Sequence, residues 1–181
     1  VYPECGLLCA DVLEQLILAE DPQTVGAFIA EPVMGGGGIV IPRPEYFRRV
    51  RGICDKYDIV YVDDEVITGF GRTGRWFAIE HWGVVPDVIT MGKGMTAGYL
   101  PMFATAISQR MYRVLADANE TLYQGFTYTG QPAIAAAALK AMEALAEEHL
   151  VERAETMGAL VAKHLEALLE YPWVGEVRNL G

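Results

Sequence analysis

The chain has 181 residues, of which 52% are hydrophobic and 21% are charged, and its formal net charge is −10 at pH 7. This composition is typical of a globular protein with one substantial core and at most a second small lobe. The acidic balance opposes a nucleic-acid partner or an anionic membrane surface. No apolar run approaches the roughly 20 residues that span a bilayer. We therefore expect a folded protein that binds neither nucleic acid nor membrane.

The cysteines and the start of the chain bear on location and completeness. Cys5, Cys9 and Cys54 are an odd number of cysteines without a neighbouring histidine. This pattern disfavours a disulfide framework or a metal site and favours a reduced, cytoplasmic setting. The chain opens on Val1 without a basic and apolar leader, and we interpret it as a fragment that is truncated at both ends.

The predicted elements alternate between helices and apolar strands. We expect helices at 9–19, 44–57, 132–149 and 151–170. We expect apolar strands at 25–31, 59–63, 87–91 and 102–107, and a further short strand after Trp173. Such strands, separated by helices and glycine-rich loops, indicate an α/β fold with a mostly parallel sheet and helices on both faces.

Three ionisable side chains directly follow predicted strands: Glu31, Asp64 and Lys93. In open α/β sheets, ligands bind outside the carboxyl ends of the strands, so these groups converge on one crevice if the strands are neighbours. A single acid at such a position commonly only ends a strand or caps the next helix. Lys93, however, stands between two glycines, where neither packing nor solubility requires a lysine. The three groups together therefore point to chemistry.

A lysine and an aspartate in one crevice suit pyridoxal 5'-phosphate (PLP). A lysine amine forms Schiff bases with carbonyls, and PLP enzymes combine such a lysine with an aspartate that keeps the pyridine nitrogen protonated. The charge-assisted hydrogen bond stabilises the pyridinium, which withdraws electrons from the substrate carbon. Lys93 and Asp64 therefore predict a PLP site.

Four segments occur in a characteristic order: AFIAEPVMGGGG, DDEVITGFGRTG, PDVITMGKGMTAGYLP and GFTYTGQPAIAAAAL. Together they resemble the class III PLP-dependent aminotransferases, the ω-aminotransferase group of the fold-type I enzymes. The resemblance is dense from about 24 to 145 and weaker toward both ends. It implies that 1–172 form the central part of the fold-type I PLP-binding large domain, with its following long helices, and that 173–181 start the C-terminal small domain.

The resemblance also implies roles for individual residues. Asp64 would be the partner of the pyridine nitrogen, Lys93 the Schiff-base lysine, and Val66 the residue that packs on the ring face. Thr127, with Phe126 beside it, would bind the cofactor phosphate of the partner subunit. The family therefore implies a homodimer with a shared active site.

The sequence departs from the family pattern at some positions. Ile67 stands where many members have a glutamine close to the ring hydroxyl of the cofactor, so the donor to that hydroxyl is open. The phosphate-cupping loop and the ring-stacking aromatic residue of the family would lie upstream of Val1. The substrate-binding arginine would lie downstream of Gly181.

The implied reaction moves an amino group from an ω-amino acid or amine to a keto acid such as pyruvate. Lys93 would hold the cofactor and then transfer the substrate proton as general base and acid. A PLP-dependent aminomutase or lyase on the same scaffold is one alternative. A truncated chain that is inactive by itself is another.

Other motifs give weaker alternatives. The glycines of 69–74 match GxGxxG, but five residues separate the strand from the first glycine, and no long helical pattern follows directly. Lys93 lacks the flanking residues of a phosphate-binding P-loop. The glycines at 35–38 form either an anion nest or a mobile loop. His81 is a base or, more simply, a packed or surface histidine. Glu31 shapes a substrate entrance or only ends its strand.

Overall fold

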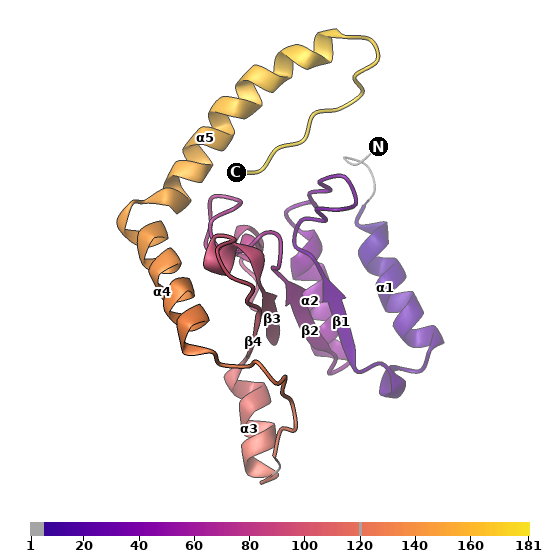
Figure 1. The fold of residues 1–181 in the computed structure, drawn as a ribbon. Coiled ribbons are helices and arrows are strands. Elements are labelled where there is room, and N and C mark those ends of the chain that lie inside the picture. The colour runs from indigo at the N-terminus through magenta and orange to yellow at the C-terminus, as the bar shows by residue number, and fades with distance from the viewer. Residues whose placement is uncertain (1–5, 120) are drawn as a thin grey trace.

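A single mixed sheet organises the computed structural model, which describes residues 6–119 and 121–181. Its strand order is β1-β2-β3-β4. The strands are β1 (Ala27–Ala30), β2 (Val60–Asp64), β3 (Val88–Met91) and β4 (Ala104–Ile107). The first three run parallel, and β4 pairs antiparallel with β3. The α/β class and the mostly parallel sheet are therefore confirmed (Figure 1).

The helices largely match the prediction, but one helix was not expected and one expected strand is absent. The four expected helices are α1 (Leu8–Ala19), α2 (Tyr46–Lys56), α4 (Pro132–Glu147) and α5 (Leu150–Leu165). A short helix, α3 (Gln109–Asp117), was missed; Ser108 caps it, because its hydroxyl accepts a hydrogen bond from the Met111 amide at 3.4 Å. The strand expected after Trp173 is wrong, since 174–181 run without regular structure.

Helix α2 fixes one face of the sheet. Four buried side chains recur at helical spacing along it: Phe47, Val50, Ile53 and Cys54. The Phe47 ring stacks on Tyr61 of β2, with 6.1 Å between ring centroids, and meets Trp82 edge-on at 5.2 Å. Such aromatic pairs each contribute about 0.5–1.5 kcal/mol beyond their buried area. They hold β2 at a fixed distance from α2.

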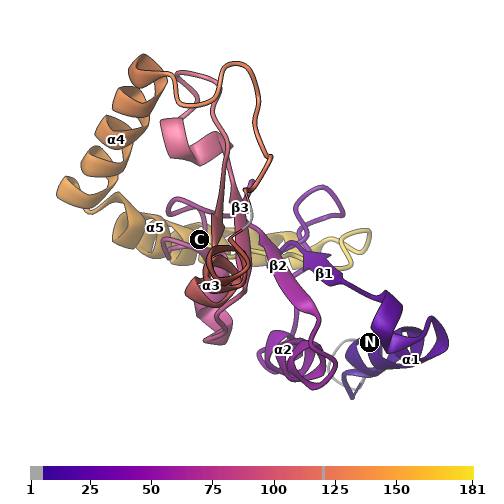
Figure 2. The same ribbon diagram turned by 90° about the horizontal axis from the view of Figure 1, so that it is seen from below.

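Helix α4 packs against the segment that follows β3. It begins with proline at its first position and is rich in alanine, both of which favour a helix. It packs on the 3-10 helix η4 (Lys93–Thr96), where Ala138 lies in a buried cluster with Phe70 and Met95. Figure 2 shows α1 and α2 on one side of the sheet and α4 on the opposite side. Packing against α4 therefore supports the turn that follows β3.

Candidate active site

The predicted site residues come together at the carboxyl edge of the sheet. Glu31 follows β1, Asp64 ends β2, and Lys93 begins the short helix after β3. The strands are parallel neighbours, with Ala30 opposite Asp63 and Asp64 opposite Thr90, so all three ends meet at the same edge. The three groups therefore share one edge of the sheet, as the strand order predicted.

Lys93 has a strained backbone. Its φ is 38°, in the left-handed region that costs a residue with a side chain about 1–2 kcal/mol. Tight packing maintains this turn: a Cβ on Gly94 would lie 3.1 Å from the Phe70 Cβ and 3.3 Å from the Gly69 carbonyl oxygen. Strain of this kind persists where the surroundings impose it, and it clusters at functional sites. The side chain of Lys93 is exposed and is free to reach a ligand.

Asp64 is placed to accept a hydrogen bond from a ligand. It is half-buried, and its Oδ1 accepts a hydrogen bond from the Val66 amide at 3.1 Å. Within 6–119 and 121–181 the other oxygen, Oδ2, accepts none. Val66 faces the lysine turn, since its Cγ1 would lie 3.8 Å from a Cβ on Gly92. Asp64, Val66 and the lysine turn are thus in one neighbourhood.

A cavity of about 790 Å³ opens beside Lys93. Its wall is rich in aromatic side chains, among them Tyr99, Phe103 and Phe126. The rings of Phe126 and Phe103 lie 6.2 Å apart, while Thr127 is exposed and does not line this cavity. The structure therefore brings Phe126 close to Lys93 and leaves Thr127 on the surface.

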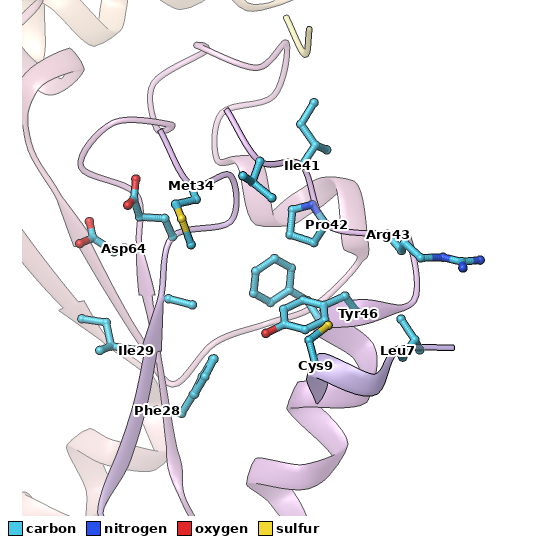
Figure 3. A pocket seen from close by; sticks show the side chains of 14 residues that line it. Leu7, Cys9, Phe28, Ile29, Met34, Ile41, Pro42, Arg43, Tyr46 and Asp64 are labelled. Atoms are coloured by element: carbon cyan, nitrogen blue, oxygen red, sulfur yellow. The ribbon is translucent and has the colours of Figure 1, made fainter. Parts of the chain in front are cut away.

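Asp64 lines a different cavity, of about 660 Å³, which lies between the end of β1, α2 and 40–43. In Figure 3, Phe28, Tyr46 and Cys9 face its interior, and Asp64 and Met34 lie toward one end. Asp64 and Lys93 thus share an edge of the sheet but contribute to separate cavities. The strand order predicted that the two residues share an edge, but it gave no information about which cavity each residue lines.

Glu31 directly follows β1 and lines the same cavity as Asp64. Its Oε2 accepts a hydrogen bond from the Gly35 amide at 3.1 Å. The glycines at 35–38 form a tight hairpin, which is closed by the bridge between Met34 and Val40. Ile67 packs on this hairpin, because its Cδ1 would lie 3.0 Å from a Cβ on Gly35.

The GxGxxG glycines serve packing. Gly71 and Gly74 have φ values of 87° and 81°, and Cβ atoms there would lie 3.1 Å from the Cγ2 of Val151 and 2.7 Å from the Cβ of Glu155 on α5. Only the short η3 (Ala78–Trp82) follows them, so this loop lacks the long helix whose amino end holds a pyrophosphate.

His81 is packed, as its simpler alternative proposed. Its Nε2 lies 3.0 Å from the Thr73 carbonyl oxygen, to which the ring N–H donates. Its ring also meets Trp82 at nearly a right angle.

Two buried acids beside Asp64 received no role from the sequence. Asp63 and Glu65 are both 0% exposed, and neither of them lines the two cavities. Burial, and next the neighbouring Glu65 carboxylate, raise the pKa of Asp63 to about 9. A signal was present in the sequence: side chains alternate along a strand, so Asp63 shares a face with the apolar-packed Tyr61 while Asp64 faces the other side.

A family model described as "Aminotransferase class-III" matches 4–181. The chain belongs to the class III aminotransferase family. The putrescine–pyruvate aminotransferase of Pseudomonas aeruginosa is 41% identical over 179 residues, which cover 98% of this chain and 39% of that protein. An omega-aminotransferase of Caulobacter vibrioides is 42% identical over 182 residues, covering 99% of this chain and 42% of that protein.

Solved structures agree with this assignment. The crystal structure of a transaminase from the marine bacterium Virgibacillus superposes with a TM-score of 0.92 at 45% sequence identity, covering 95% of this chain and 39% of that one. This class III chain therefore spans about two fifths of the length of the relatives that it matches. The fold-type I large-domain architecture expected from the sequence is confirmed.

Class III aminotransferases depend on PLP, and the residues of this edge fit that cofactor. Lys93 is held in a strained turn with its amine exposed, and Asp64 has an oxygen available for a protonated ring nitrogen. Within the part of this class III chain that the structure describes, no group of three or more His, Cys, Asp or Glu side chains is arranged to hold a metal ion. Among the same residues, no helix is both long and apolar enough to cross a membrane.

Proposed function

We propose that the protein carrying this chain catalyses PLP-dependent transamination, from an ω-amino acid or amine to a keto acid such as pyruvate. The observation that carries the proposal is the strained Lys93 turn beside the half-buried Asp64, at the shared carboxyl edge of two parallel strands. The printed names of relatives support the reaction class, since they include a putrescine–pyruvate aminotransferase and gamma aminobutyrate transaminases.

The residues of the chain would divide the work as follows. Lys93 Nζ would hold the aldehyde carbon of the cofactor in a Schiff base and, once the amino donor has released it, would move the substrate proton as base and then as acid. Asp64 would accept a hydrogen bond from the ring nitrogen through Oδ2, and Val66 would pack on the ring face. When bound, PLP supplies the electron sink for the substrate carbon. Ile67 offers no hydrogen-bond donor and packs on Gly35 instead.

A homodimer in the cytoplasm belongs to the same proposal. Thr127 and Phe126 would contact the cofactor phosphate of the partner subunit. Three large aromatic side chains of this segment are at least half exposed, at 94% for Tyr123, 55% for Phe126 and 66% for Tyr128, which suits a surface that a second subunit covers. The division into 1–172 as large domain and 173–181 as the start of the small domain also remains a proposal.

The test is transamination by the longest natural polypeptide that carries this chain. Lys93→Ala should lower the rate by about 10²- to 10⁴-fold or more, the range lost with a general acid–base group. Lys140→Ala changes an exposed lysine on α4 and should leave the rate unchanged. Equal rates in all three proteins would contradict the proposal.

Omitting the keto acid separates the alternatives within the family. A transaminase needs the acceptor for sustained turnover, whereas an aminomutase or lyase does not. Product formation that continues without any keto acid would favour the aminomutase or lyase.

A further inference from the structure

The three consecutive acids at the end of β2 face different surroundings. Asp64 is half-buried and lines a cavity, whereas Asp63 and Glu65 are completely buried and line neither cavity. This follows from the alternation of side chains along a strand. Two buried carboxyl groups therefore lie directly behind the residue that the proposed function assigns to the cofactor.

Glu65 is already an acceptor at both of its oxygens. Its Oε1 accepts a hydrogen bond from the Ile79 amide at 2.9 Å, and its Oε2 accepts one from the Thr68 hydroxyl. Asp63 stands two residues before Glu65, and the Glu65 carboxylate is one of the groups that raise the pKa of Asp63. Both oxygens of Asp63 are buried, and neither has a hydrogen-bond partner among the described residues.

Two buried carboxyl groups in contact cannot both be charged, so the pair must hold one proton. Donors already occupy both oxygens of Glu65, which makes it the acceptor of the pair. The proton therefore belongs to Asp63, whose O–H would donate to Glu65. This assignment follows from the donors around Glu65 and from the unpartnered, buried oxygens of Asp63.

We propose that Asp63 is a positioning residue, whose protonated carboxyl group fixes Glu65 and thereby the loop that supports the turn of Lys93. The inference rests on the proposed function, because it concerns how the residues of that site are held. It assigns to Asp63 no contact with substrate or cofactor.

The path from Glu65 to Lys93 runs through the loop after β2. Glu65 holds both the start and the end of this loop, through Thr68 and Ile79. Between them, the Gly69 amide donates to the Glu65 carbonyl oxygen at 3.0 Å. Gly69 and Phe70 then pack directly on Gly94, the residue after Lys93. Loss of the Asp63 hydrogen bond would loosen this support.

Burial and the carboxylates of Glu65 and Asp64 favour the protonated form of Asp63. The buried hydroxyl of Tyr61 lies on the same strand, two residues away. On α2, the buried thiol of Cys54 lies behind Tyr61. The guanidinium of Arg51 lies over the Tyr61 ring at 5.7 Å and is paired with other acids.

The sign of the pH effect follows from the raised pKa of Asp63, which burial and Glu65 bring to about 9. An aspartate in an unfolded chain titrates near pH 3.9, so the folded protein holds one more proton than the unfolded chain between about pH 4 and pH 9. Stability from this group is therefore complete below that window and falls as pH rises through it. The expected change approaches a tenfold rise in the unfolding constant per pH unit.

The experiment compares wild type, Asp63→Asn and Asp117→Asn in the longest natural polypeptide that carries the chain. Asparagine keeps the shape and a donor for Glu65 but does not titrate, and Asp117 is an exposed residue of α3 that serves as the matched control. Urea unfolding without cofactor is measured from pH 6 to pH 9. The unfolding constant of wild type should rise relative to that of Asp63→Asn by up to about tenfold per pH unit, while Asp117→Asn should follow wild type.

A second readout addresses positioning. Asp63→Ala removes the donor and should weaken PLP binding at pH 7 by about tenfold, whereas Asp63→Asn should restore affinity to within about threefold of wild type. Parallel pH dependences for wild type and Asp63→Asn, or equal PLP affinities for the alanine and asparagine variants, would overturn the proposal. These results do not depend on whether the protein transaminates, so they can be told apart from a failure of the proposed function.

Discussion

Two buried aspartates, one at each end of the sheet, have opposite electrostatic surroundings. Asp87, just before β3, accepts hydrogen bonds from Arg51 at 2.7 Å and from the Tyr61 amide at 2.9 Å, and Arg110 lies 3.1 Å from its other oxygen. Burial alone would raise its pKa, but the Tyr61 amide and the two arginines outweigh it and lower the pKa. Asp63, at the far end of β2, faces another acid, and its pKa is raised.

The difference separates a structural edge from a binding edge. At the amino end of β3 the buried acid, Asp87, has two arginines and a backbone amide as partners. Its negative charge is therefore compensated by protein groups and needs no ligand. At the carboxyl edge the buried Asp63 has no hydrogen-bond partner among the described residues, and a lysine is held at a φ of 38°. Perturbed acids and strained backbone of this kind gather at functional sites, where the protein is built for a ligand that supplies the missing interactions.

Breaking the structural edge should have the largest effect on stability. Asp87→Ala leaves Arg51, whose side chain is only 15% exposed, without its closest partner, and should lower the free energy of unfolding by about 3–5 kcal/mol. Urea denaturation at pH 7 measures this. Asp58→Ala, which removes an 88% exposed partner of Arg110, is the control and should cost no more than about 1 kcal/mol. Similar losses of unfolding free energy in the two variants would contradict the structural role of Asp87.

The pH dependence of the stability of Asp87→Ala tests the opposite pKa shifts of Asp87 and Asp63. The folded pKa of Asp87 is lowered, so its contribution is present above the unfolded value near 3.9 and is lost as pH falls through the folded pKa. Wild type should therefore lose more stability than Asp87→Ala on acidification below about pH 4. Asp63 acts in the opposite direction, on the alkaline side.

Gly94→Ala should have an intermediate effect at the binding edge. The new Cβ would approach the Phe70 Cβ to 3.1 Å, so the lysine turn must shift, at a cost of about 1–3 kcal/mol. Gly26→Ala is the control, because nothing lies within 4 Å of a Cβ there. Thermal unfolding compares the two. If Gly94→Ala is as stable as the control, the loop does not hold the turn in the way described.

Lys93→Gly should have the smallest effect, and a stabilising one. Glycine adopts a φ of 38° without the strain of a lysine, so stability should rise by up to about 1–2 kcal/mol while the amine is lost. Lys93→Ala keeps the strain and should gain nothing, which separates backbone relief from loss of charge. A lower stability for the glycine variant than for the alanine variant would show that the turn is not strained.

Much of the architecture was predictable because strands carry local signals. Apolar runs ending in Asp64 and just before Lys93 predicted both the strands and the shared edge, since parallel neighbours place their carboxyl ends together. Helix α3 was missed because it is short and because its start is marked in the sequence only by the capping residue Ser108. The absent strand after Trp173 shows that a short segment with a few apolar residues does not by itself specify strand pairing.

The parts of the site that escaped prediction depend on tertiary partners. The assignment of the proton to Asp63 requires Thr68 and Ile79 around Glu65, and the partners of a buried acid cannot be read from neighbouring letters. The partition of Asp64 and Lys93 between two cavities likewise depends on the hairpin at 34–40 and on the aromatic wall. The roles of Phe126 and Thr127 stay predictions, because they concern a second subunit.

The most direct test of the account is to map where PLP attaches. The longest natural polypeptide that carries the chain is incubated with PLP, reduced with borohydride and digested, and the modified peptide is identified by mass. The three exposed lysines Lys56, Lys140 and Lys163 are internal controls. We expect a label confined to Lys93. A label spread over the four lysines of the chain, or none in the folded protein, would contradict it.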